Sequence, residues 1–131
     1  MKNLFGHPPF FCFLFFVSSI LRAAESGPFL PVISQLDSRD IAFRQFIEDV
    51  EASRRVLFTG RAAPESLASF LTVYVYTPAE SEDILQVAAR CSLPYESIAT
   101  LNRISHPEDF KTGEAMFLPS VPGLFIPDTP G

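Results

Sequence analysis

Few residues in this chain could carry out chemistry. The sequence has two histidines, His7 and His106, and two cysteines, Cys12 and Cys91. A catalytic zinc ion needs about three protein ligands, usually imidazoles, thiolates or carboxylates, with one coordination position left open. His7 and Cys12 fall in an N-terminal segment that we expect to be removed, so no cluster of histidines or mixed His/Cys ligands can assemble. The sequence therefore predicts no metal site and no cofactor.

Two metal-free arrangements remain. Cys91 and His106 would be a nucleophile and its base, but we expect Cys91 to face the core at the end of a helix, where nothing favours the thiolate. The acids Glu80, Glu82 and Asp83 are similar to the carboxylate pair of glycoside hydrolases only in composition, since they share one short exposed loop without an apolar pocket. The sequence therefore predicts no catalytic residue, and a binding protein in place of an enzyme.

An export signal accounts for the N-terminus. Residues 10–21 form an apolar run after a short positive start, and the small residues Ala23 and Ala24 follow it. This is the outline of a secretory signal peptide, and the run is shorter than the roughly 20 residues of a membrane-spanning helix. We expect residues 1–24 to be a signal peptide, cleaved between Ala23 and Ser26. The chain would then reach the periplasm or cell envelope, and only a retained signal would touch the membrane.

Charge and cysteine content narrow the function classes further. Removal of Lys2 and Arg22 with the signal leaves eight basic and fifteen acidic residues, a formal charge of −7. Such a chain has no basic surface for nucleic acid. Cys91 is then the only cysteine, so no internal disulfide forms, and we expect it to be a small buried apolar residue.

Residues 25–71 are expected to be a helical N-terminal segment and linker. A helix should begin near Asp37 or Ser38, either of which can cap it, with Asp40 in its first turn. Its apolar positions follow a spacing of i, i+3, i+4, i+7 and are Phe43, Phe46, Ile47 and Val50. Arg54 and Arg55 close the helix and Gly60 marks its exit. The stripe predicts either packing against the following residues, which we favour, or a docking face for a partner.

Residues 72–119 predict a small α+β module. The run 71–76 is rich in β-branched and aromatic residues and predicts a strand, while Asp83 begins a helix that ends near Cys91. Pro94 starts a second short helix, and residues 115–118 form a second strand that Pro119 ends. The order strand, helix, helix, strand predicts a two-stranded antiparallel sheet covered by the helix pair, preceded by the amphipathic helix. Residues 120–131 are rich in proline and glycine and predict a linker.

The spacing of residues 76–119 resembles the LysM (lysin motif) family, without insertion or deletion over these 44 residues. Positions that match the family pattern are the opening Tyr76; Ile84, Val87 and Ala88 at its first helix; Ile98, Leu101 and Asn102 at its second; Ile104 and Pro107 in the loop; Lys111, Gly113 and Glu114 at its "K-P-G-Q"; and Leu118 with Pro119. The family's "G-D-T" is Ser81-Glu82-Asp83 here. The whole arrangement is similar to the N-terminal part of bacterial cell-wall endopeptidases, in which a LysM module precedes a lysostaphin-like zinc peptidase domain.

The resemblance implies a βααβ fold and a groove for N-acetylglucosamine-containing glycan between two loops. Backbone and side-chain polar groups would pair with sugar hydroxyl and amide groups, and apolar side chains would pack on the ring faces. Asn102 is expected to brace the second loop by hydrogen bonds to the backbone. The implied glycan-binding residues are Ser81, Glu82, Asp83, Ile84, Arg103, Ile104, His106 and Pro107. For the acids among them helix capping is an equally good interpretation, and for His106 an exposed turn.

Two functions stay open from the sequence. The first is an exported, non-catalytic peptidoglycan-binding protein whose partners are glycan strands. The second is an accessory or interaction subunit for a separate cell-wall hydrolase, and replacement of the family's glycine by Ser81 favours it slightly. A truncated remnant of an endopeptidase is a third interpretation.

Overall fold

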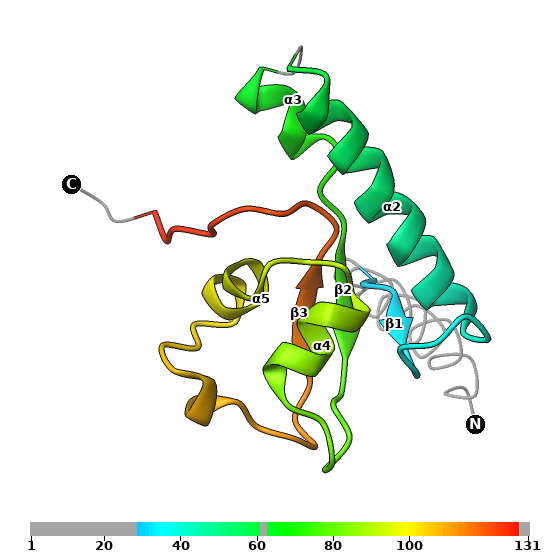
Figure 1. Ribbon diagram of the computed structural model, residues 1–131, viewed down its shortest axis with the longest axis vertical. Helices are drawn as coiled ribbons and strands as arrows, with labels where there is room; N and C mark the ends of the chain where they lie inside the picture. The colour runs from blue at the N-terminus through cyan, green and yellow to red at the C-terminus, as the bar shows by residue number, and fades with distance from the viewer. Residues whose placement is uncertain (1–28, 61–62, 129–131) are drawn as a thin grey trace, which may run out of the picture.

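The computed structural model describes residues 29–60 and 63–128 (Figure 1). The predicted signal peptide, residues 1–24, lies outside them. In chain order the described elements are strand β1 (Val32–Ile33), helix α2 (Ile41–Phe58), helix α3 (Pro64–Ala68), strand β2 (Val73–Tyr76), helix α4 (Ile84–Arg90), helix α5 (Tyr95–Leu101), the 3-10 turn η1 (Pro107–Asp109) and strand β3 (Met116–Pro119). Within this part of the chain no helix has the length and apolar character needed to cross a membrane.

The chain is α+β, as predicted, but its sheet has three strands where we expected two. β2 and β3 pair antiparallel, with Tyr74 opposite Leu118 and Tyr76 opposite Met116. β1 adds a parallel strand on the other side of β2, so the order is β1-β2-β3 and the sheet is mixed. The sequence pattern missed β1 because only two residues pair there, too few for an alternating pattern.

One face of the sheet forms the core. Alternate residues of a strand point to opposite faces, and the buried set is Ile33, Tyr74, Tyr76, Met116 and Leu118, which α2, α4 and α5 cover with Phe46, Val50, Ile84, Val87 and Ile98. The other face carries Val32, Val73, Val75 and Phe117, of which Val32 is 57% and Phe117 44% exposed. The helices therefore bury only one side of the sheet.

Helix α2 begins at Ile41, later than the predicted Asp37 or Ser38, because Asp40 is the N-cap. The Asp40 carboxylate accepts the N–H of Phe43 and also those of Ser34 and Gln35. Asp37 lies in the turn before the helix, where its carboxylate accepts the N–H of Arg39 at 2.7 Å and pairs with the Arg39 guanidinium at 3.0 Å. The helix also runs one turn past the predicted end at Arg55, to Phe58.

The apolar stripe of α2 packs against the rest of the protein, which confirms the favoured interpretation. Phe46 is fully buried and meets the ring of Tyr74 edge to face, with 5.2 Å between centroids. Polar groups add two further links from α2: Asp49 accepts the hydroxyl of Tyr74 at 2.7 Å, and the Ser53 hydroxyl donates to the carbonyl of Ser120 at 2.9 Å. The residues before the βααβ part are therefore structurally continuous with it.

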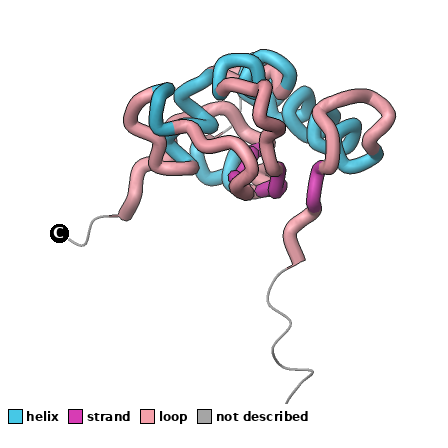
Figure 2. Tube along the Cα trace, turned by 90° about the horizontal axis from the view of Figure 1, so that it is seen from below, coloured by secondary structure: helices cyan, strands magenta, loops and turns pink. Residues whose placement is uncertain are grey.

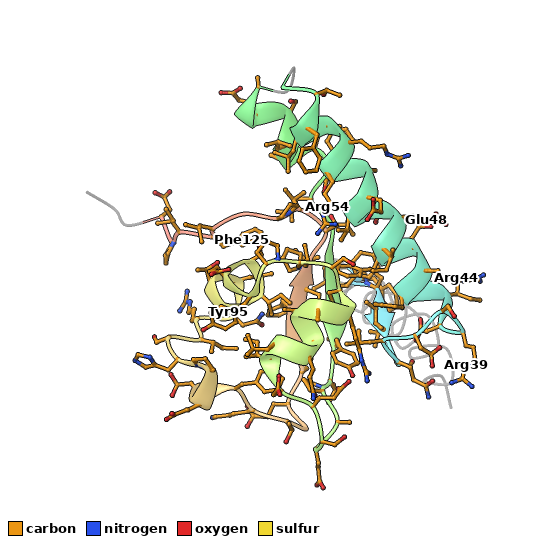
Figure 3. All side chains as sticks on the ribbon, viewed as in Figure 1. Arg39, Arg44, Glu48, Arg54, Tyr95 and Phe125 are labelled. Atoms are coloured by element: carbon orange, nitrogen blue, oxygen red, sulfur yellow. The ribbon has the colours of Figure 1, made fainter. Side chains whose placement is uncertain are left out.

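Figure 3 shows that some side chains of α2 extend away from the rest of the protein and others reach toward it. Arg44 and Glu48 extend from the outer side of the helix and are exposed. Arg54 reaches toward the turn between α4 and α5, where its guanidinium donates to the carbonyl of Ser92. Between Arg44 and Glu51 the exposed face of α2 is thus polar or charged, while Ile41 and Phe58 at its two ends are exposed apolar residues.

Helices α4 and α5 both end in a Schellman motif. After α4, Ser92 adopts φ 55° and the N–H of Leu93 returns to the carbonyl of Ala88. After α5, Arg103 adopts φ 57° and the N–H of Ile104 returns to the carbonyl of Ala99. These ends turn the chain sharply, first from α4 into α5 and then from α5 into the loop toward β3.

Cys91, the C-cap of α4, is fully buried, as predicted. Burial raises the pKa of its thiol to about 12, so the thiol stays protonated at neutral pH. A protonated thiol without solvent access is a packing residue and a poor nucleophile.

The residues after β3, which were predicted to be a linker, form hydrogen bonds with helix α5. Gly123 donates its N–H to the hydroxyl of Ser97, and Phe125 donates its N–H to the hydroxyl of Thr100, so the chain lies along α5. Figure 2 shows this tail and the residues before β1 leaving from opposite sides of the molecule.

Candidate functional site

Two loops meet at one end of the sheet. The first, residues 77–83, connects β2 to α4, and the second, residues 102–115, connects α5 to β3. Gly113 donates its N–H to the carbonyl of Pro78 at 2.9 Å and so joins them. Gly113 has φ +76°, a conformation that glycine adopts without the steric cost of a side chain. The position matches the glycine in the sequence pattern described above.

A pocket of about 290 Å³ lies within the second loop and the start of β3. Its lining residues fall into three short stretches, 102–104, 109–111 and 114–116. They provide cations at Arg103 and Lys111, carboxylates at Asp109 and Glu114, and apolar surface at Phe110, Ile104 and Met116. The formal charges balance, so the pocket suits a neutral ligand with many hydrogen-bonding groups and an apolar face, as a sugar has.

Asn102 supports this pocket through its side chain. Its Oδ1 accepts the N–H of Phe117 at 2.8 Å, and its Nδ2 donates to the carbonyl of Phe117 at 2.7 Å and to that of Ile98 at 2.9 Å. The amide thereby pairs with the outer edge of β3 as a neighbouring strand would. It fixes the distance between the end of α5 and β3, which are two walls of the pocket.

Replacement of Asn102 by alanine should lower the free energy of unfolding by about 2 kcal/mol, because it removes these hydrogen bonds and leaves both backbone groups of Phe117 without a protein partner. Urea unfolding followed by circular dichroism measures the change. Glu96→Gln, an exposed change on the same helix, should stay within about 0.5 kcal/mol of the wild type. Equal stability of the Asn102 and Glu96 variants would contradict the role given to the amide.

The loop residues predicted to contact glycan are placed in different environments. Arg103 and Ile104 line the pocket: Arg103 is exposed, and Ile104 is partly buried against the core. His106 and Pro107 are exposed at the start of η1 and do not line it. The N–H of His106 donates to the carboxylate of Asp109 at 3.1 Å, which stabilises the turn.

Ser81, Asp83 and Ile84, which were predicted to contact glycan, lie outside this pocket. Ile84 belongs to the core, with 1% of its surface exposed. Asp83 caps α4: its carboxylate accepts the N–H of Gln86 at 2.8 Å, while the Gln86 side chain accepts the N–H of Asp83. Ser81 is exposed and does not line the pocket.

Glu82 forms both an ion pair and hydrogen bonds through its side chain. Its side chain is only 8% exposed, forms a 3.0 Å ion pair with Arg90, and accepts hydrogen bonds from the Tyr76 hydroxyl and the Ala79 N–H. Burial, together with the hydrogen bond to Glu82, raises the pKa of Tyr76, so its hydroxyl remains a donor at neutral pH. The carboxylate of Glu82 therefore stabilises the conformation of the first loop.

Six of the nine residues that line the pocket are outside the site predicted from the sequence. Asp109, Phe110, Ala115 and Met116 line it, but the sequence predicts them only as loop or strand residues. Lys111 and Glu114 carried a signal, since both match the family pattern, yet their part in a pocket depends on how the second loop folds. Among the described residues, no three His, Cys, Asp or Glu side chains come together as a metal site would require.

Compared with known protein families, curated proteins and solved structures, the chain matches none of them.

Proposed function

We propose that this protein is an exported, non-catalytic module that binds peptidoglycan through N-acetylglucosamine-containing glycan. The proposal rests above all on the charge-balanced pocket at residues 102–104, 109–111 and 114–116, which offers both donors and acceptors beside apolar side chains. The order β2-α4-α5-β3 supports a LysM-like module, since it follows the strand, helix, helix, strand unit of that family. The N-terminal sequence supports delivery to the periplasm or cell envelope.

A single shallow pocket should bind weakly. Association costs several kcal/mol of lost translational and rotational freedom, and a small contact area offsets little more than that. We therefore expect dissociation constants on the order of tens of micromolar or weaker for short glycans, and stronger retention on an insoluble polymer that offers many copies of the ligand.

Sedimentation with insoluble peptidoglycan tests the function. The purified chain at tens of micromolar, on the order of the expected dissociation constant, should pellet with the polymer and be released by soluble N-acetylglucosamine oligomers. If the purified chain stayed in the supernatant, the proposed function would be wrong.

The second candidate function, an accessory subunit for a cell-wall hydrolase, is favoured by the open face of the sheet. Val32 and Phe117 expose 57% and 44% of their surface there, an apolar area without a cover among the described residues. A histidine-rich peptidase domain encoded in an adjacent reading frame would support this candidate. Its absence would remove the proposed partner.

A further inference from the structure

A second hollow, of about 380 Å³, lies beside the first loop. Its walls come from residues 34–37, which connect β1 to α2, from Thr77 and Ala79 of the first loop, and from Arg90 of α4. The connection between β1 and α2 belongs to the N-terminal segment. This hollow therefore exists because that segment packs onto the βααβ part of the chain.

One hydrogen bond joins the loops that line the two hollows. Pro78 lies between Thr77 and Ala79, which both line the second hollow, and its carbonyl accepts the N–H of Gly113 at 2.9 Å. Gly113 precedes Glu114, which lines the first pocket. The first loop, which lines the second hollow, and the second loop, which lines the first pocket, are thus joined by this hydrogen bond.

The guanidinium of Arg90 lines the second hollow and is paired with Glu82. Buried Glu82 anchors it through the 3.0 Å ion pair, and Glu82 is itself held by Tyr76 and Ala79. Among the described residues, Glu82 is the only acceptor bonded to Arg90. The remaining N–H groups of the guanidinium are therefore free to donate to a ligand.

Charge balance indicates what kind of ligand fits. Arg90 is paired with Glu82, and Asp37, the other charged lining residue, is paired with Arg39 at 3.0 Å. The lining holds two carboxylates and one guanidinium, and that guanidinium is already paired, so the hollow offers no unpaired cation to an anionic ligand. Its uncharged groups are the hydroxyls of Ser34 and Thr77 and the amide of Gln35, with buried Leu36 and Tyr76 as apolar lining. These groups suit the hydroxyls and the ring face of a neutral sugar.

We propose that the second hollow is a further sugar subsite, so that the protein binds an extended, uncharged oligosaccharide across both hollows. This inference rests on the proposed function, because the first sugar occupies the pocket at residues 102–116. It assigns a binding role to the N-terminal segment, through Gln35 and its neighbours.

The test compares two lengths of β-1,4-linked N-acetylglucosamine oligomer. The purified chain is titrated with chitobiose and with chitopentaose, with binding followed by NMR and calorimetry. The pentamer should bind at least about tenfold more tightly than the dimer, since it makes hydrogen bonds in a second hollow. Resonances of Gln35 and Thr77 should shift with the pentamer and stay in place with the dimer.

A double variant tests whether the tighter binding of the pentamer comes from the second hollow. Gln35→Ala with Thr77→Ala removes two exposed side chains that make no hydrogen bond within the described residues. It should weaken pentamer binding by about tenfold and leave dimer binding unchanged. Gln45→Ala, which removes an exposed glutamine on α2 away from both hollows, is the matched control and should change neither affinity.

The outcomes separate the two proposals. Equal affinity for both oligomers, or a double variant that binds the pentamer as the wild type does, would overturn the second subsite and leave the proposed function standing. Absence of binding to either oligomer would overturn the proposed function itself. The Gln35 and Thr77 resonances decide the matter in the wild-type protein even if the double variant is unstable.

Discussion

Phe46→Ala is expected to destabilise the whole protein by about 3–5 kcal/mol, the cost of removing a fully buried aromatic side chain from a packed core. Phe46 contributes more than apolar area, because its ring meets Phe43 at 6.2 Å and Tyr74 at 5.2 Å between centroids. A loss of this size is a large part of the 5–15 kcal/mol that stabilises a typical domain. Chemical unfolding followed by circular dichroism should show a single transition at lower denaturant.

Phe58→Ala is the matched control, since this residue lies on the same helix and is 87% exposed. It should change the free energy of unfolding by less than about 0.5 kcal/mol. If Phe46→Ala melted α2 and left the βααβ part folded, two transitions would appear. That result would contradict the structural continuity between α2 and the sheet.

Arg103→Gly is expected to weaken binding to N-acetylglucosamine oligomers by about tenfold without loss of stability. The variant removes a guanidinium that lines the first pocket, and a hydrogen bond from a charged group contributes about 1.5–3 kcal/mol. Glycine is chosen because Arg103 has φ 57°, a left-handed conformation that glycine adopts at lower cost. A weaker affinity therefore reports the lost side chain and not a misfolded loop. Calorimetric titration measures it.

Ser92→Gly is the control for the backbone effect. Ser92 occupies the equivalent position after α4, with φ 55°, and does not line the first pocket. Both glycine variants should be as stable as the wild type or slightly more so. Ser92→Gly should bind glycan as the wild type does. Equal affinity of Arg103→Gly and wild type would show that the guanidinium does not contact the ligand.

The order of the elements could be predicted from the sequence, because strong local signals mark them. Asp83 caps α4 as expected, and the aromatic and β-branched run ending at Tyr76 forms β2. The start of α2 was misplaced because Asp37 and Asp40 are both good caps by type. Only the backbone conformation decides between them, and it turns Asp40 toward Phe43. β1 is defined by its neighbour β2, which no local pattern can reveal.

The site was harder to predict than the fold. Arg103 and Ile104 carried a signal, since they follow the last turn of α5, and both line the pocket. The sequence predicts Glu82 as a loop acid that contacts glycan or caps a helix, but its carboxylate is buried against Tyr76 and Arg90. Whether a loop carboxylate turns inward depends on partners distant in sequence. For the same reason the second hollow, which joins residues 34–37 to Arg90, has no signature in the sequence.

Glycan binding by the second loop is the central part of the proposed function. Two-dimensional amide NMR of the labelled chain, titrated with a soluble N-acetylglucosamine oligomer, tests it residue by residue. We expect the largest shifts at residues 102–104, 109–111 and 114–116, the stretches that line the first pocket, and none along the outer face of α2. An unchanged spectrum, or shifts confined to other surfaces, would contradict the claim.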